Sequence, residues 1–93
     1  MASIAFITGA TSGFGKATAY KFAAHGDDVI INGRRADRLQ QGADDIETKY
    51  NVAVMQLPFD VRNEEAVFSS IRSLPANWKK IDILVNNAGL AAG

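Results

Sequence analysis

The sequence predicts an α/β protein whose core is a parallel sheet, and three features of the chain lead to this prediction. Short apolar runs alternate with longer amphipathic segments in the order strand–helix–strand–helix–strand–helix–strand. The predicted strands are apolar at most positions, as expected when helices cover both faces of a sheet. Right-handed crossovers then favour the strand order 3-2-1-4. Residues 1–93 are therefore expected to form one unit, the N-terminal half of a doubly wound sheet.

The composition is that of an ordinary globular domain. Hydrophobic residues make up 47% of the chain and charged residues 22%, and ten basic side chains balance ten acidic ones. A net charge of zero argues against nucleic acid or a membrane surface as a partner. No apolar stretch approaches the ~18–20 residues that span a bilayer, and the N-terminus lacks the basic leader of a signal peptide. With no cysteine and no leader, the expected location is the cytoplasm.

The first half of the chain supplies two predicted strands, over 3–8 and 28–32, and two predicted helices, over 14–25 and 36–50. The first strand stops at Gly9, and the first helix is expected to end before Gly26, in the position where glycine commonly closes a helix. In the second helix, apolar side chains recur every three to four residues. This spacing predicts one buried helix face.

The second half repeats the alternation. A third strand is predicted over 52–59, and Asn63 is expected to cap a third helix that Pro75 ends. The fourth strand is predicted over 81–85, and Trp78 before it is interpreted as a packing aromatic. The buried face of the third helix is expected to contain Val67, Phe68, Ile71 and Leu74.

The turn after the first strand is rich in glycine and leads directly into a helix N-terminus. Free backbone N–H groups and the positive end of the helix dipole make such a turn an anion site. Gly9 would permit the sharp turn, Gly13 would let a diphosphate approach the backbone, and Gly15 would let the helix pack closely on the sheet. Glycines that serve only turning and packing are the alternative, which the position between a strand and a helix disfavours.

A phosphate-binding P-loop is excluded at two positions. That motif needs a glycine five residues before its Gly-Lys pair and a hydroxyl residue directly after it. Here Gly15-Lys16 is preceded at that position by Ala10 and followed by Ala17. There is no hydroxyl group to hold magnesium.

Three markers resemble those of the short-chain dehydrogenase/reductase family. They are the loop Thr8-Gly9-Ala10-Thr11-Ser12-Gly13-Phe14-Gly15, the pair Asp60-Val61 and the segment Asn86-Asn87-Ala88-Gly89. Each follows a predicted strand, and the resemblance spans the whole chain, which corresponds to the N-terminal part of a usual member. The resemblance implies a Rossmann-like fold. It assigns cofactor contacts in the loop to Gly9, Thr11, Ser12, Gly13, Phe14 and Gly15.

The residues after the second strand indicate which dinucleotide the site would take. An acidic residue at this point selects NAD through the ribose hydroxyls, but residues 32–35 read Asn-Gly-Arg-Arg. A guanidinium can bind the 2′-phosphate of NADP through charge-assisted bonds. We therefore predict NADP(H), with Arg34 on the 2′-phosphate, Arg35 near the adenine, and Ser12 or Thr11 assisting. Solvated charges at a helix start are the alternative, although cations oppose the dipole there.

The other two markers carry roles that the resemblance implies. Asp60 would accept a hydrogen bond from the adenine amino group, and the N–H of Val61 would bind a ring nitrogen. A loop or capping carboxylate is the alternative for Asp60.

In the fourth-strand marker, Asn86 and Asn87 are expected mainly to hold adjacent strands together, since an amide can donate and accept at once. In the family this segment also lies beside the adenosine ribose. Ala88 and Gly89 would let the cofactor approach the backbone.

The chain lacks the family's catalytic pair, a Tyr followed four residues later by a Lys. Only Tyr20 and Tyr50 are present, and Ala24 and Val54 stand four residues after them. An unperturbed tyrosine pKa near ~10 is too high for proton transfer at neutral pH. No catalytic residue and no metal site is assigned. The chain alone is predicted to be inactive, as the N-terminal part of an enzyme or as a truncated product.

Within the family, three segments are similar to NADP-dependent dehydrogenases of serine, allo-threonine or 3-hydroxy acids. They are Gly13-Phe14-Gly15, Gly33-Arg34-Arg35 with Arg38-Leu39, and Leu74-Pro75-Ala76-Asn77-Trp78 leading to residues 81–91. The implied reaction interconverts a secondary alcohol, such as a hydroxy acid, and a ketone. The alternative is a non-catalytic nucleotide-binding or interaction module.

A homo-oligomer is also expected. The fourth predicted strand would leave an apolar sheet edge whose unpaired N–H and C=O groups can pair with another chain.

Overall fold

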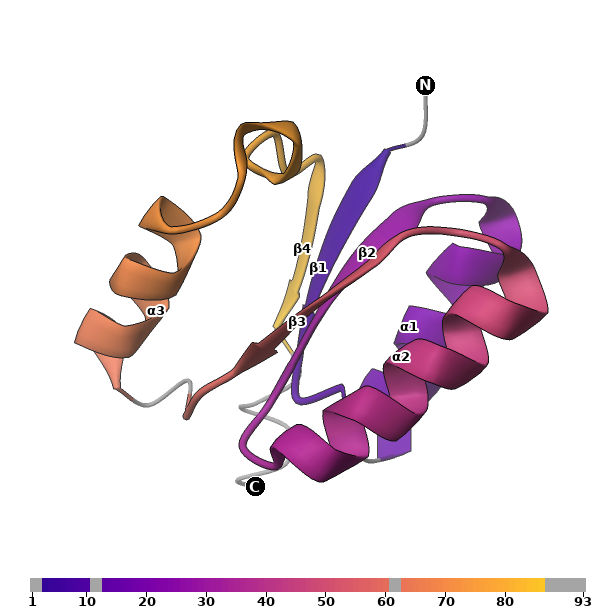
Figure 1. The fold of residues 1–93 in the computed structure, drawn as a ribbon, viewed down its shortest axis with the longest axis horizontal. Coiled ribbons are helices and arrows are strands. Elements are labelled where there is room, and N and C mark those ends of the chain that lie inside the picture. Colours follow the sequence, from indigo (N-terminus) through magenta and orange to yellow (C-terminus); the bar gives the residue numbers. More distant parts are fainter. Residues whose placement is uncertain (1–2, 11–12, 61–62, 87–93) are drawn as a thin grey trace.

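The computed structural model describes residues 3–10, 13–60 and 63–86. In these ranges lie four strands and three α-helices, and a short 3-10 helix precedes the last strand (Figure 1). In chain order, the elements are β1 (Ile4–Thr8), α1 (Gly13–His25), β2 (Asp28–Gly33), α2 (Ala36–Tyr50), β3 (Val54–Pro58), α3 (Glu64–Arg72), η1 (Ala76–Trp78) and β4 (Ile83–Asn86).

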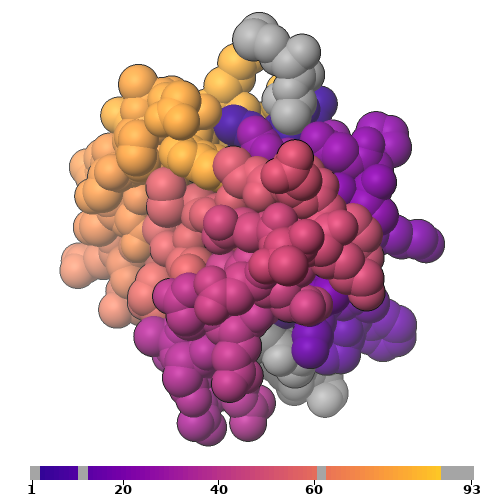
Figure 2. Space-filling view, turned by 45° about the vertical axis from the view of Figure 1, so that its right-hand side comes forward, coloured from indigo at the N-terminus to yellow at the C-terminus, as the bar shows by residue number. Residues whose placement is uncertain are grey.

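The strands form one parallel sheet in the order β3-β2-β1-β4, which confirms the predicted fold class and strand order. Figure 1 shows α1 and α2 on one side of the sheet and α3 on the other. In the space-filling view, α2 (magenta) faces the viewer, with α1 (indigo to violet) to its right and the α3–η1 region (orange) to its left (Figure 2). Among the described residues, no helix is long and apolar enough to cross a membrane.

Apolar side chains form one cluster on each face of the sheet. Because successive side chains of a strand point to opposite faces, Ile7 packs towards α1 and α2, whereas Phe6 packs towards α3 and η1. The cluster under α1 and α2 is the larger and includes Leu39 and Ile46 from α2. On the other face, Trp78 packs with Phe6, as predicted for a packing aromatic.

Two predicted helix caps are confirmed. The side chain of Asn63 accepts a hydrogen bond from the Ala66 N–H at 3.1 Å. Gly26 closes α1 with a φ of 102°, a left-handed conformation that suits glycine. The following N–H, that of Asp27, reaches back to the carbonyl of Phe22 at 3.1 Å, the bond that defines a Schellman motif.

The predicted third helix is wrong in two respects. It ends at Arg72, before Pro75, and Phe68 is 61% exposed rather than part of a buried face. Val67 and Ile71 are half-buried and Leu74 is buried, in a line spaced by four and three residues. Phe68 lies beside that line, so its side chain stays exposed to solvent when the helix packs against the sheet. The third strand is shorter than predicted, at 54–58, and the fourth begins and ends later than predicted, at 83–86.

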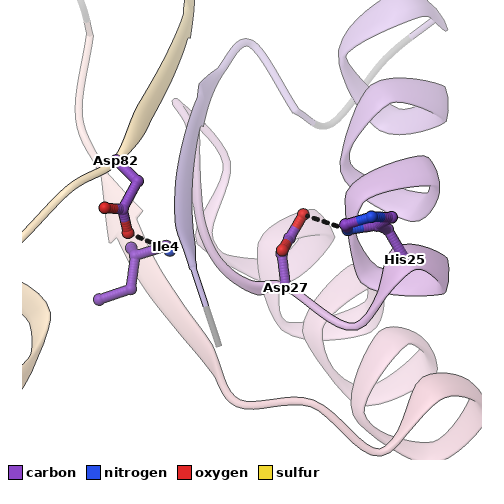
Figure 3. Close-up of polar contacts among 4 residues, drawn as sticks. All are labelled: Ile4, His25, Asp27 and Asp82. Atoms are coloured by element: carbon purple, nitrogen blue, oxygen red, sulfur yellow. Dashed lines mark hydrogen bonds and ion pairs between the residues drawn. The ribbon is translucent and has the colours of Figure 1, made fainter. Parts of the chain in front are cut away.

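Aspartate carboxylates accept hydrogen bonds from backbone N–H groups at the end of the sheet where the strands begin. Asp82 accepts a hydrogen bond from the Ile4 N–H at 2.9 Å, and Asp28 accepts one from the Ala53 N–H at 3.0 Å. Nearby, the Asp27 carboxylate lies 3.2 Å from Nδ1 of His25 (Figure 3). These contacts lie at the end of the sheet opposite the loops that the sequence assigns to a nucleotide.

Replacing Gly42 with alanine should stabilise the fold. Gly42 lies inside α2, where glycine costs about 0.5–1 kcal/mol relative to alanine. A Cβ atom there would meet only Cδ1 of Ile31, at 3.9 Å, which is ordinary van der Waals contact. We expect the free energy of unfolding, measured by urea titration, to rise by about 0.5–1 kcal/mol. A lower free energy of unfolding would show that α2 requires a glycine at position 42.

Candidate functional site

The predicted site residues that the structure describes lie where the parallel strands end. Gly9 follows β1, Arg34 follows β2, Asp60 follows β3 and Asn86 ends β4. The register aligns these ends, since Thr8 pairs with Asn86 and Gly33 pairs with Pro58. Four segments that are distant in sequence therefore meet at the carboxyl ends of the strands. In open α/β sheets these ends are where ligands bind.

The three glycines of the loop, all within the described residues, have conformations or contacts that favour glycine. Gly9 and Gly13 have φ angles of 63° and 47°, in the left-handed region. At Gly15, a Cβ atom would lie 1.9 Å from the carbonyl oxygen of Gly9 and 2.6 Å from its carbonyl carbon. The turning role of Gly9 and the close packing at Gly15 are thus confirmed. Their contacts with a cofactor stay predictions.

The first two N–H groups of the loop are directed to one residue, Asn32. The Gly9 N–H donates to Oδ1 of Asn32 at 3.4 Å, and the Ala10 N–H donates to its main-chain carbonyl at 2.7 Å. The first N–H groups of α1, which include those of Phe14 and Gly15, have no partner one turn back within the helix. An anion at this loop would therefore meet the helix N-terminus and its positive dipole. The Phe14 side chain is 78% exposed beside it.

Asn32 is a site residue that the sequence analysis missed. Its side chain is buried at 1% exposure, and Nδ2 donates to the carbonyls of Leu57 and Phe59 at 2.9 and 3.0 Å. It therefore links the loop after β1 to the end of β3. One signal was available, because an asparagine ends an otherwise apolar strand, and a buried amide needs hydrogen-bond partners.

The two arginines after β2 differ in their surroundings. Arg35 occupies the N-cap position of α2, and its guanidinium lies 3.4 Å from the carboxylate of Asp37 in the first helical turn. This hydrogen bond lowers the pKa of Asp37. The negative charge of Asp37 offsets the unfavourable placement of a cation at a helix N-terminus. Arg34 is exposed and forms no ion pair with any residue that the structure describes.

Hydrogen bonds hold the ends of β3 and β4. The carbonyl of Asp60, a half-buried residue, accepts from the Asn63 N–H at 2.9 Å. The hydroxyl of Thr8 lies 3.0 Å from Oδ1 of Asn86, which joins the ends of β1 and β4 through their side chains. This agrees with the predicted role of Asn86 in holding adjacent strands together. Thr11, Ser12, Val61, Asn87, Ala88 and Gly89 lie outside the described residues.

A cleft of about 380 Å³ lies between α1 and α2, and Tyr20 is one of the residues that line it. The Tyr20 hydroxyl donates a hydrogen bond to Asp45, and its ring meets that of Tyr50 edge-on at 6.2 Å. Burial, reinforced by Asp45, raises the pKa of Tyr20 to about 12. This shift is opposite to the lowered pKa that a tyrosine needs for proton transfer at neutral pH. The described residues also hold no cluster of three His, Cys, Asp or Glu side chains suited to a metal.

A parallel sheet in the order 3-2-1-4, with a glycine turn leading from β1 into α1, defines a Rossmann-type α/β domain. A family model described as short chain dehydrogenase matches residues 3–93. The chain therefore belongs to the short-chain dehydrogenase family.

Curated relatives match nearly the whole chain. An NADP-dependent 3-hydroxy acid dehydrogenase of Salmonella typhi is 50% identical over 90 residues, which cover 97% of this chain and 35% of the relative. A serine 3-dehydrogenase of Rhizobium radiobacter is 46% identical over 93 residues, which cover 100% and 36%. The chain thus spans about a third of the length of these relatives.

Solved structures share the fold. L-Sorbose reductase of Gluconobacter frateurii, in complex with NADPH and L-sorbose, matches with a TM-score of 0.88 and 38% identity, covering 95% of this chain and 34% of that one. The closed form of a serine dehydrogenase complexed with NADP+ matches with a TM-score of 0.74 and 44% identity, covering 87% and 31%.

Proposed function

We propose that this chain forms the NADP(H)-binding part of an oxidoreductase that interconverts a secondary alcohol, a hydroxy acid in particular, and a ketone. The observation that carries the proposal is the end of β2, where an exposed guanidinium without an acidic partner among the described residues, Arg34, stands in place of a carboxylate. Relatives that are described as NADP-dependent or as complexed with NADP+ support the same cofactor.

The proposed contacts divide among the four loops at the carboxyl edge of the sheet. Arg34 takes the 2′-phosphate and Arg35 lies near the adenine, as Asp60 does on the neighbouring loop. The diphosphate lies against the N-terminus of α1, where backbone N–H groups and the dipole favour negative charge. The complete proposed set is Gly9, Thr11, Ser12, Gly13, Phe14, Gly15, Arg34, Arg35, Asp60, Val61, Asn87, Ala88 and Gly89.

When bound, NADP(H) supplies the hydride acceptor or donor. The residues of this chain bind and orient it. The charge pattern also discriminates between the two nicotinamide cofactors, since a guanidinium gains charge-assisted hydrogen bonds only from the 2′-phosphate. A carboxylate in its place would repel that group.

Titration of the chain with NADP and NAD tests the cofactor assignment. We expect tighter binding of NADP, with an affinity that falls as salt is added, because screening weakens contacts between exposed charges. Equal affinity for the two cofactors, or no binding of either, would contradict the proposal.

The second candidate is a non-catalytic nucleotide-binding or interaction module. The coding sequence after codon 93 discriminates between the two. A downstream Ser and Tyr-x-x-x-Lys in frame favours the oxidoreductase. A stop followed by unrelated sequence favours the module.

The purified chain should show no dehydrogenase turnover even if it binds NADPH. Neither tyrosine is followed by the required lysine, and the pKa of Tyr20 is raised to about 12. Each missing acid/base group costs about 10²–10⁴ in rate. The assay follows NADPH oxidation with 3-keto acids, a serine-derived substrate and simple ketones. Turnover above that of buffer would reveal an unassigned catalytic group among the 93 residues.

A homo-oligomer is part of the proposal, and so is location in the cytoplasm. The oligomer is supported by Leu84 of β4 and Phe68 of α3, which are 67% and 61% exposed. Large exposed apolar side chains near a sheet edge favour association.

A further inference from the structure

We propose that Asn32 is a positioning residue of the nucleotide site, which holds the glycine loop, Arg34 and the Asp60 loop in one arrangement on which the affinity for NADP(H) depends. This inference rests on the proposed function. It assigns to Asn32 no contact with the cofactor.

The placement of Asn32 connects it to each proposed contact region. Its side chain and main chain accept hydrogen bonds from Gly9 and Ala10, which open the glycine loop. Its amide group donates to Phe59, the residue before Asp60. Arg34 follows it by two residues in the chain. One buried residue thus contacts the start of the glycine loop and the residue before Asp60, and lies two residues before Arg34.

The hydrogen-bonding capacity of Asn32 matches this position. An asparagine amide carries two donor hydrogens and an acceptor oxygen, and here both kinds of group have partners, on Leu57, Phe59 and Gly9. A carboxylate would lack donors for the two carbonyls, and serine has only one hydroxyl hydrogen. At 1% exposure Asn32 is shielded from bulk solvent, so its buried partner groups would be costly to leave without a hydrogen bond.

The consequence for binding follows from the size of the ligand. NADP would extend from Arg34 and the Asp60 loop to the N-terminus of α1, so its affinity includes the alignment of these segments. If these segments are not held in this arrangement before the ligand binds, binding must order them, and this cost weakens the affinity. A ligand that does not reach the glycine loop bears less of this cost.

The experiment compares two ligands on two variants. In Asn32→Ser and Asn32→Ala, we expect the Kd for NADP to rise roughly 10–100-fold, the range seen when the outer partners of metal ligands are removed. The Kd for 2′-AMP, which lacks the diphosphate and the nicotinamide half, should rise by a smaller factor than the Kd for NADP, because 2′-AMP contacts the Arg34 and Asp60 segments but does not reach the glycine loop. Asn77→Ala, at an exposed asparagine in η1, is the matched control and should change neither value.

General damage to the fold would weaken both ligands alike, so a parallel loss for NADP and 2′-AMP overturns the inference, as does an unchanged Kd for NADP. No NADP binding by the unsubstituted chain overturns the proposed function and this role together.

Amide hydrogen exchange keeps the inference testable if the variants do not fold. In the unsubstituted chain without nucleotide, the Ala10 N–H and the Asn32 side-chain amide should be protected, whereas the Phe14 N–H should gain protection only with NADP. Rapid exchange of the Ala10 N–H and the Asn32 amide would overturn it.

Discussion

Replacing Gly15 with alanine is expected to destabilise the fold by about 3 kcal/mol or more and to abolish NADP binding. The new Cβ atom would lie 1.9 Å from the Gly9 carbonyl oxygen, and this neighbour is backbone, so no side-chain rotation relieves the clash. Either α1 or the glycine loop must move, and both are proposed to hold the diphosphate. Urea unfolding gives the change in stability, and NADP titration of the folded fraction gives the change in binding.

Gly13→Ala is the matched control in the same loop. A Cβ at Gly13 meets nothing within 4 Å, so the only cost is its φ of 47°. That conformation costs an alanine about 1–2 kcal/mol. If Gly15→Ala were no more destabilising than Gly13→Ala, the close approach between Gly15 and Gly9 would be contradicted.

Replacing Arg34 with alanine is expected to weaken NADP binding on the order of 10–100-fold and to leave NAD binding almost unchanged. A hydrogen bond to a charged group contributes about 1.5–3 kcal/mol, and each 1.4 kcal/mol corresponds to a tenfold change in Kd. Arg34 is exposed and has no acidic partner among the described residues, so the substitution should change stability little. Calorimetric titration with both cofactors measures the effect.

Two further substitutions separate this effect from general charge loss. Arg35→Ala should weaken NADP binding less than Arg34→Ala, because the Arg35 guanidinium already lies 3.4 Å from the Asp37 carboxylate. Lys80→Ala, at an exposed position before β4, should leave both affinities unchanged. If Arg34→Ala reduced NAD binding as much as NADP binding, Arg34 would not recognise the 2′-phosphate.

Local patterns in the sequence were sufficient for the order of elements and for most of their boundaries. The 36–50 helix was predicted at both ends, since its apolar residues keep a helical spacing. Gly26 and Asn63 act as the caps that their residue types favour. Right-handed crossovers then restricted the strand order to the one observed. The glycine turn was placed correctly for the same reason, because a turn between a strand and a helix depends on adjacent residues.

Distances between segments far apart in the chain were decided only by the tertiary structure. The sequence does not indicate that Phe68 stays exposed beside a helix face that packs on the sheet. It also gave Asn32 no role, because the amide partners of Asn32 lie 23 to 27 residues away. Periodicity and capping are properties of neighbours in the chain. A buried hydrogen bond, by contrast, forms only where folding brings a donor and an acceptor within about 3 Å of each other.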